Sequence, residues 1–475
     1  MGLRCLTLVV SAWLSLSTAS AAVSPFAPGQ SGHLFTLHGS NTVGARLAPE
    51  LARDYLLAKG AESVSIRAGQ KENEYRIEGR GPAGPVYIDV AAHGSGTGMS
   101  GLASGEAQVA MASRPIKASE EALLADYGPM RTFEAEHVVA IDGLAVIVHR
   151  SNPVEALTVD QIARLFSGEV RNWSQVGGPD RAVSLYARDN KSGTWDSFKS
   201  MVLNGRFALS RDARRFESND RLSDSVAADP GAIGFVGLAS VRQAKALSVS
   251  QDGTQPLRPE PLYVATEDYA LSRRLFMYTL PGRTPPLVRE YIEYVHSRAG
   301  QERVAEVGFV SQNPVSLKPE LTAQAPVSYK ALVGHAERLS INFRFDEGSS
   351  RLDNKARWDI ERLARFMTAP ENRERQLQLI GFGDAEQTEH RALVLSQMRA
   401  LRVKAALRDR GIDAASVVGF GSDLPVAANK EGVRLKNQRV EVWVFDGSAS
   451  QRVNDAKDDM ELRRAAERDS VSSRL

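Results

Sequence analysis

Short apolar runs alternate with helical patterns from about Leu34 to Ser316, and this alternation constrains the fold more than any other feature of the chain. The run Val86–Val90 is rich in β-branched and aromatic residues, as strands are. The run Leu144–Val148 is continuously apolar, which is typical of a strand covered on both faces. Helical patterns such as Arg46–Leu57 lie between these runs. The alternation predicts an α/β fold, and roughly 280 residues are long for one core, so we expect two lobes.

A different pattern follows a proline-containing stretch. We interpret residues 30–315 as the first domain and residues 316–338 as a linker. Apolar residues then alternate at Leu339, Ile341 and Phe343, as in a half-buried strand, and helical stripes and further strands come after them. Residues 339–446 are therefore predicted to form an α+β domain. The charged, Ser-rich residues 447–475 are predicted to be a disordered tail or a solvated helix.

The first 22 residues have the pattern of a secretory signal peptide. Arg4 is followed by an apolar stretch, and Ala19-Ser20-Ala21 fits the small-x-small cleavage rule. Removal of residues 1–22 would also remove Cys5, the only cysteine, so neither a disulfide nor a cysteine-based zinc site is expected. We see no second apolar run long enough to span a membrane, so the mature chain is expected to be soluble after export.

Composition excludes several classes of function. The chain has 59 Lys plus Arg and 57 Asp plus Glu, a balance that gives no sign of nucleic-acid binding. Its 8 His are scattered, and we find no nucleophile–base pair or metal cluster of the kind an enzyme needs. We therefore predict a binding protein without enzymatic activity, metal or cofactor.

Three segments share a chemistry that suits an oxyanion. They are Gly39–Gly44, Gly94–Gly98 and Arg188–Thr194, and each places glycine and hydroxyl residues at a predicted strand-to-helix turn. Glycine lets the backbone approach a ligand, and the free N–H groups at a helix start favour negative charge. Arg188 could add a charge-assisted contact. Each segment alone also fits an ordinary turn, and none has the glycine spacing of a dinucleotide or nucleoside-triphosphate loop.

Taken in order, these segments resemble the phosphate-binding protein of bacterial phosphate ABC transporters. The resemblance spans roughly residues 34–315 and rests on GSNTVG, GSGTG, ASGEAQVAMASRPIK, LTVDQIARLFSGEVRNWSQVGG, RDNKSGTWDSF and PGAIGFVG. It implies a two-lobed periplasmic binding protein (type II-like) that closes on a dehydrated phosphate. The implied ligand contacts are Thr42 and Val43, largely through their backbone, together with Ser95, Arg188, Ser192, Gly193 and Thr194.

One position departs from that family. Many members have an Asp that accepts the proton of phosphate and so rejects sulfate, whereas this chain has Ala112-Ser113-Arg114 there. An arginine cannot accept a proton. We include Ser113 and Arg114 among the candidate anion contacts, with an ion pair as the alternative role of Arg114, and phosphate-over-sulfate selectivity stays open.

Residues 339–446 resemble the OmpA-like peptidoglycan-binding domain. The resemblance rests on the FxF strand, a Gly-x-x-Asp ending at Asp384, an LSxxRA helix containing Arg399, and an Asn-x-Arg-Val-Glu strand with Asn437 and Arg439. That family binds the diaminopimelate of the cell-wall peptide. The resemblance implies Asp384 and Arg399 as the key contacts, with Asn437 and Arg439 as residues that shape the peptidoglycan site. The departures are Gly383, Ala392 and Gln438, which indicate weaker binding.

Together these features predict a secreted binding protein held on the cell wall. One domain would capture phosphate or a related oxyanion, and the other would tether it to peptidoglycan, in the periplasm or at the outer membrane of a Gram-negative bacterium. An ABC permease is a further candidate partner. The alternative is an envelope scaffold or adhesin whose first domain no longer binds a ligand.

Overall fold

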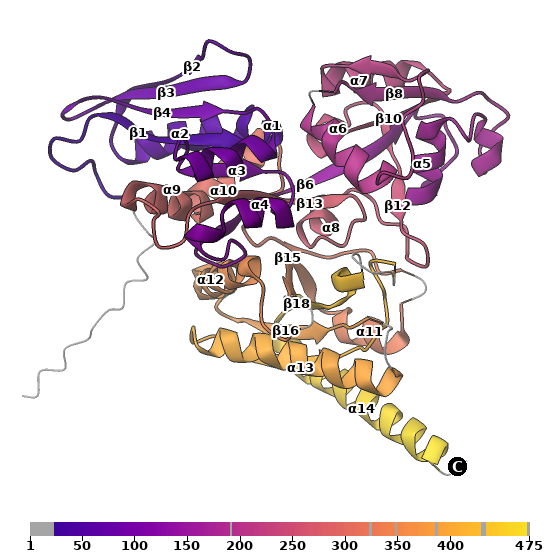
Figure 1. Ribbon diagram of the computed structural model, residues 1–475. Helices are drawn as coiled ribbons and strands as arrows, with labels where there is room; N and C mark the ends of the chain where they lie inside the picture. Colours follow the sequence, from indigo (N-terminus) through magenta and orange to yellow (C-terminus); the bar gives the residue numbers. More distant parts are fainter. Residues whose placement is uncertain are drawn as a thin grey trace, which may run out of the picture.

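The computed structural model describes residues 23–472 except 191, 323–324, 347–348, 385–387 and 429–433. The predicted signal peptide, residues 1–22, lies outside the described residues. Two lobes stand side by side, and a C-terminal domain packs beneath the strands that join them (Figure 1). The phosphate-cleft candidates belong to the lobes, and the cell-wall candidates belong to the C-terminal domain.

The first lobe is built on strands that follow the N-terminal part of the chain. Its strands are β1 (Gly32–Gly39), β2 (Glu62–Ala68), β3 (Glu74–Gly81), β4 (Gly84–Ala91) and β5 (Val109–Ala112). Helices α2 (Leu47–Ala58), α3 (Ser95–Ser104), α9 (Pro286–His296) and α10 (Arg298–Val307) belong to the same lobe. Leu37, Leu51 and Tyr291 are fully buried in one apolar cluster between the sheet and these helices. Burial of this amphipathic surface is what holds the lobe together.

The second lobe repeats the arrangement with a smaller sheet. Its strands are β8 (Ser184–Arg188), β9 (Arg214–Phe216) and β10 (Ala232–Gly237), and its helices include α5 (Val159–Ser167), α6 (Gly193–Phe198) and α7 (Asn219–Ala228). Phe198 and Phe235 stack at 3.9 Å between ring centroids in its core. Helix α5 begins at the Thr158 cap, whose side chain accepts from the Gln161 N–H, so the sequence itself sets where the helix starts.

Two long antiparallel strands join the lobes. They are β6 (Glu136–Val148) and β13 (Ser272–Tyr278), and the sheet order is β2-β3-β4-β1-β5-β13-β6-β10-β8-β9. Every residue of β6 after Glu136 is buried, which explains the continuously apolar run Leu144–Val148. This arrangement confirms the prediction of a two-lobed α/β fold.

The C-terminal domain has its own five-stranded sheet, in the order β14-β15-β18-β16-β17. Its strands are β14 (Ser316–Leu317), β15 (Glu337–Arg344), β16 (Arg375–Gly381), β17 (Ala414–Gly419) and β18 (Arg439–Asp446). Helices α12 (Asn354–Thr368) and α13 (Glu389–Arg408) pack on one face through a cluster that includes Leu363, Val403 and Val442. The α+β class of this domain is as predicted.

The predicted linker and tail are more ordered than expected. Within 316–338 the chain forms β14, which pairs with β15, and α11 (Val327–Val333). Residues 447–475 were predicted to be disordered or a solvated helix, but α14 (Ser450–Ser472) packs Val453 and Met460 into the cluster that covers the second face of the sheet. Both corrections have one cause, because these segments gain their stability from tertiary contacts with that face. Among the described residues, no helix is both long and apolar enough to cross a membrane.

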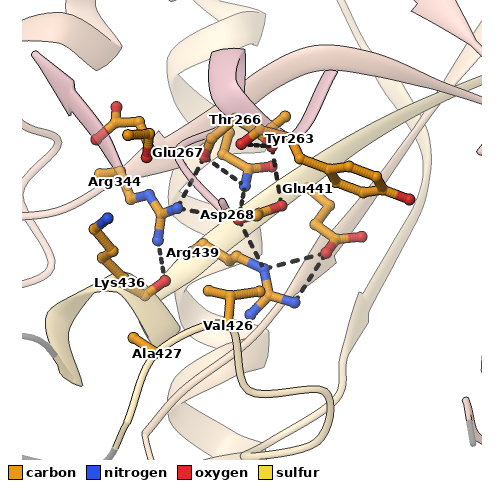
Figure 2. A network of polar contacts seen from close by, with 12 residues as sticks. Tyr263, Thr266, Glu267, Asp268, Arg344, Val426, Ala427, Lys436, Arg439 and Glu441 are labelled. Carbon is orange, nitrogen blue, oxygen red and sulfur yellow. Dashed lines mark hydrogen bonds and ion pairs between the residues drawn. The ribbon is translucent and has the colours of Figure 1, made fainter. Parts of the chain in front are cut away.

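The two domains meet through a buried ionic network around Asp268, which is only 2% exposed (Figure 2). Its carboxylate accepts hydrogen bonds from Arg338 at 2.6 Å and from Arg344 at 3.2 Å, both from β15. Burial alone would raise the pKa of Asp268, but the surrounding guanidinium charges outweigh burial and lower it. Nearby, Arg274 of β13 binds Asp353 at 2.7 Å. The C-terminal domain is therefore docked directly on the strands that join the lobes.

Candidate functional site

A cleft of about 790 Å³ lies between the two lobes. Its walls come from the strand-to-helix turns that the sequence singled out and from the joining strands. The lining residues that carry polar groups include Thr42, Arg46, Asp142, Arg188, Ser192, Thr194 and Asn219. Such a collection of donors around one space suits a small, multiply charged oxyanion.

The lobes touch each other at Thr42 and Gly193. Thr42 belongs to the short helix α1 (Asn41–Gly44) that follows β1, and Gly193 begins α6. A Cβ at Gly193 would lie 1.8 Å from the Thr42 Oγ1, so only glycine permits this approach. The preceding Ser192 caps α6, because its Oγ accepts from the N–H groups of Thr194 and Trp195. The structure thus brings together four of the predicted contacts, Thr42, Ser192, Gly193 and Thr194.

Arg188 ends β8 and brings a buried cation to the cleft. Its guanidinium donates to the backbone carbonyls of Phe216 and Glu217 and to the side chain of Asn219. These acceptors fix its orientation, and no described carboxylate lies within ion-pair distance of it. Burial lowers the pKa of Arg188, yet an arginine stays charged. The cleft therefore holds a positive charge that is free to meet an anion.

The sequence analysis missed an ion pair at the base of the cleft. Asp142 of β6 lines the cleft, and Arg273 of β13 binds its Oδ2 through Nε at 3.0 Å and Nη2 at 2.8 Å. Arg273 also donates to Thr42 Oγ1 at 3.2 Å and to the Gly193 carbonyl at 3.3 Å. One side chain from a joining strand thus bridges both lobes. No local motif marks either residue, because each sits within a strand rather than at a turn.

Four predicted anion contacts do not line the cleft. Val43 is fully buried in the core of the first lobe. Ser95 starts α3, and its Oγ accepts from the Ser113 N–H, so these two serines bind each other. Arg114 forms a bidentate ion pair with Glu120, in which Nη1 donates to Oε2 at 2.9 Å and Nη2 donates to Oε1 at 2.7 Å. The prediction for Arg114 is corrected to an ion pair within its own lobe, since this geometry uses its charge locally.

The predicted cell-wall residues lie close to the end of β16, to the start of β18 and to α13. Asp384 follows β16 and is 7% exposed, and its Oδ2 accepts from Gln438 at 2.6 Å. Arg399 of α13 donates to the Phe382 carbonyl at 3.4 Å. Burial lowers the pKa of Arg399, and the charge of Asp384 opposes that shift. A carboxylate and a guanidinium whose charges act on each other can bind a zwitterion, with carboxylate to ammonium and guanidinium to carboxylate.

The other two predicted cell-wall residues have internal roles. Asn437 holds the loop before it, because its side chain bonds the N–H groups of Val426 and Ala427 and the Ala427 carbonyl. Arg439 is 2% exposed and pairs with Glu441 at 2.9 Å. It also approaches Asp268 at 3.9 Å (Figure 2). Asn437 therefore supports the loop at Val426 and Ala427, and Arg439 supports the domain interface, while their part in shaping a wall site stays a prediction.

Comparison with known proteins identifies both domains. The model of the PBP superfamily domain matches residues 78–299, and the model of the OmpA family matches residues 344–439. Protein SphX of Synechococcus elongatus is 31% identical over 237 residues, which cover 47% of this chain and 69% of that protein. The chain belongs to the PBP superfamily. Its PBP domain contains the cleft, and its OmpA domain contains Asp384 and Arg399.

One further curated relative and two solved structures are similar to parts of the chain. Phosphate-binding protein PstS of Bacillus subtilis is 29% identical over 224 residues, which cover 47% of this chain and 70% of that protein. A solved ABC-type phosphate transport receptor from Vibrio cholerae is 26% identical with a TM-score of 0.46, covering 58% of this chain and 99% of that one. The peptidoglycan-associated lipoprotein from Burkholderia pseudomallei is 24% identical with a TM-score of 0.20, covering 22% of this chain and 88% of that one. The sequence matches confirm the resemblance to PstS-like binding proteins joined to an OmpA-like domain.

Proposed function

We propose that the PBP domain binds inorganic phosphate or a closely related oxyanion in the cleft between its lobes. The observation that carries this proposal is the buried Arg188, which has no described carboxylate partner and faces hydroxyl and backbone donors from both lobes. Relatives named as phosphate-binding proteins support the choice of ligand. They are binding proteins, and we infer that this chain likewise binds its ligand without transforming it.

We propose that Asp142 distinguishes a protonated ligand from an unprotonated one. Its Oδ2 is held by Arg273, and no described donor binds its Oδ1. A carboxylate oxygen accepts hydrogen bonds but cannot donate one. A protonated oxyanion such as hydrogen phosphate can donate to it, whereas sulfate cannot. Asp142 thus offers an acceptor that Ser113 and Arg114 do not supply.

We further propose that the OmpA domain binds peptidoglycan through Asp384 and Arg399, with diaminopimelate as the zwitterion. A PBP domain joined to an OmpA domain supports a location in the cell envelope. Because β14 and α11 pack into the OmpA domain, the two domains form a docked pair rather than two modules on a long tether. We infer phosphate capture or sensing at a fixed place on the wall, with delivery to a permease only where one lies within reach.

The decisive experiment is calorimetric titration of the ligand-free protein, first with phosphate and then with sulfate. We expect micromolar or tighter binding of phosphate, and we expect Arg188→Ala to reduce that affinity at least ~100-fold, since it removes a charge-assisted contact in a desolvated site. Arg221→Ala removes an exposed arginine of α7 outside the cleft and serves as the matched control. Absence of binding to either anion would contradict the proposal and favour the scaffold alternative.

Retention on peptidoglycan separates the two modules. Arg188→Ala should sediment with purified sacculi as the unchanged protein does, because its site lies in the other domain. Loss of both activities in a folded Arg188→Ala protein would contradict the two-module proposal.

A further inference from the structure

A second cavity, of about 110 Å³, lies where the PBP domain meets the OmpA domain. The PBP domain contributes Leu257, Tyr263 and Asp268 to its walls, and the OmpA domain contributes Arg338 and Trp443, among others. None of its lining residues lines the oxyanion cleft. It is therefore a separate space, built only when the two domains are docked.

The two buried carboxylates at this cavity, Asp268 and Glu441, already accept several hydrogen bonds. The two oxygens of Asp268 accept from Arg338 and Thr266 and from Asn342 and Arg344, respectively. Glu441 Oε1 accepts from Arg439, and its Oε2 accepts from Tyr329 and Trp443. Each of the four oxygens thus has at least one charged donor or two donors. A cationic ligand would find no free acceptor on these groups.

The guanidinium groups, in contrast, have donors to spare. Arg338 uses its Nη2 for Asp268 and Asn342, but its Nη1 donates to no described acceptor. Its Nε, like the Nη1 of Arg439, is buried without a hydrogen-bond partner. Arg439 and Val426 both line the cavity. The lining has two guanidinium groups, of Arg338 and Arg439, and three carboxylates, of Asp268, Glu320 and Glu441, so the unpaired donors rather than the net charge distinguish this cavity. Buried polar groups in this state favour a partner that brings acceptors.

Tyr263 supplies a neutral donor on the PBP side. It is half-buried, lines the cavity, and its hydroxyl makes no hydrogen bond to a described residue. Burial raises the pKa of Tyr263, so the hydroxyl keeps its proton at neutral pH and can donate. The remaining walls are largely apolar and include Leu257, Leu321, Ala325, Val426 and Trp443.

We propose that this junction binds the carboxylate of a small acid whose other end is a short apolar group. The carboxylate brings the acceptors that Arg338 and Tyr263 lack, and a tail of a few carbons fills the apolar walls of a 110 Å³ space. A free short-chain acid and the carboxyl end of a peptide share this chemistry. Because both domains contribute walls, the bound acid would also hold the domains together.

Ligand-observed NMR and calorimetry of the full chain test the proposal, with butyrate as the probe and saturating phosphate present to occupy the oxyanion cleft. We expect a dissociation constant on the order of a millimolar or tighter, a size-limited affinity for so few atoms. Butyramide keeps the shape without the charge and should bind at least ~10-fold more weakly. A blocked dipeptide, N-acetyl-alanyl-alanine, distinguishes the sources: binding by it alone assigns a peptide terminus, and binding by butyrate assigns a free acid.

Variants place the binding at this cavity. Val426→Phe fills the space from the OmpA side and should abolish binding, and Tyr263→Phe removes only the hydroxyl and should weaken it at least ~3-fold. Val327→Phe adds the same ring at a position of α11 that is 74% exposed and outside the cavity, so it should leave binding unchanged. Absence of butyrate and dipeptide binding, equal binding of butyramide, or an unchanged affinity in Val426→Phe would each overturn the proposal. Phosphate titration of the same samples reports the oxyanion cleft separately.

Discussion

Replacing Asp268 by Asn tests whether the ionic network holds the two domains together. The substitution keeps the volume of the side chain and removes one negative charge that is 2% exposed. It also turns an acceptor into an amide that donates toward Arg338 or Arg344, which now contact Asp268 at 2.6 and 3.2 Å. Breaking one partner of a buried ion pair costs about 3 to 5 kcal/mol, because the other charges stay buried without compensation.

Native-state hydrogen exchange measures this loss of stability at the domain interface itself. A loss of about 3 to 5 kcal/mol corresponds to exchange that is faster by about two to four orders of magnitude. We expect that acceleration in the peptides that cover β13 and β15, whose residues form the interface. Asp224→Asn is the matched control, since its pair with Arg242 joins side chains that are 52% and 46% exposed. Exposed pairs of this kind contribute about 1 kcal/mol at most.

Lowering the pH tests the contribution of Asp268 to the domain interface in a second way. The pKa of Asp268 is lowered in the folded protein, so its contribution is complete above the ordinary Asp value and is lost as the pH falls below it. Asp268→Asn should remove that part of the acid sensitivity. Equal exchange rates in Asp268→Asn and Asp224→Asn would refute the reasoning, because the interface would then not depend on the charge of Asp268.

Three further changes have defined outcomes. Asp142→Asn should lower the ratio of phosphate to sulfate affinity at least ~10-fold in calorimetric titration, and an unchanged ratio would show that Asp142 does not read the ligand proton. Asp384→Asn should release the protein from sacculi in a sedimentation assay while the matched Asp446→Asn, at the exposed far end of β18, stays bound; equal retention would move the wall site elsewhere. Burial lowers the pKa of His137 to about 4, so the unfolded chain takes up the proton first as the pH falls. The free energy of unfolding, measured with urea, should therefore be complete above about pH 6.5 and fall by about 3 kcal/mol toward pH 4. His137→Asn should flatten this pH dependence, and an unchanged pH dependence in the variant would contradict the assignment.

The sequence predicted the parts of the cleft that depend on local chemistry. Glycine and hydroxyl residues at Thr42 and at Ser192–Thr194 mark strand-to-helix turns, and a turn places its own residues at the end of a strand wherever the strand packs. Arg188 follows from the same rule, as the last residue of β8. The sequence could not reveal Asp142 and Arg273, because the partner of a charged residue in mid-strand depends on which strand pairs beside it.

Motif reasoning failed where distant segments compete for the same side chain. Arg439 stands in a motif position that predicted a role in shaping the wall site, but it pairs with Glu441 and lies 3.9 Å from Asp268, which is distant in the sequence. Helix α14 shows the same effect in secondary structure. Its composition is highly charged, yet Val453, Ala456 and Met460 fall on one face and bury against the OmpA sheet. Spacing alone could have raised the helix above the disordered alternative.

Strand β13 ties the two candidate sites together through neighbouring residues. Side chains alternate along a strand, so Arg273 binds Asp142 at the base of the oxyanion cleft while Arg274 binds Asp353 of the OmpA domain. Arg273 bridges Thr42 and Gly193 of opposite lobes, and Arg274 binds Asp353 at the start of α12. A change in the angle between the lobes must bend β6 and β13, and the OmpA domain is docked on those strands. Phosphate binding and the domain interface therefore share one structural element, and the variants that loosen Asp268 are expected to alter the rate at which phosphate leaves the cleft.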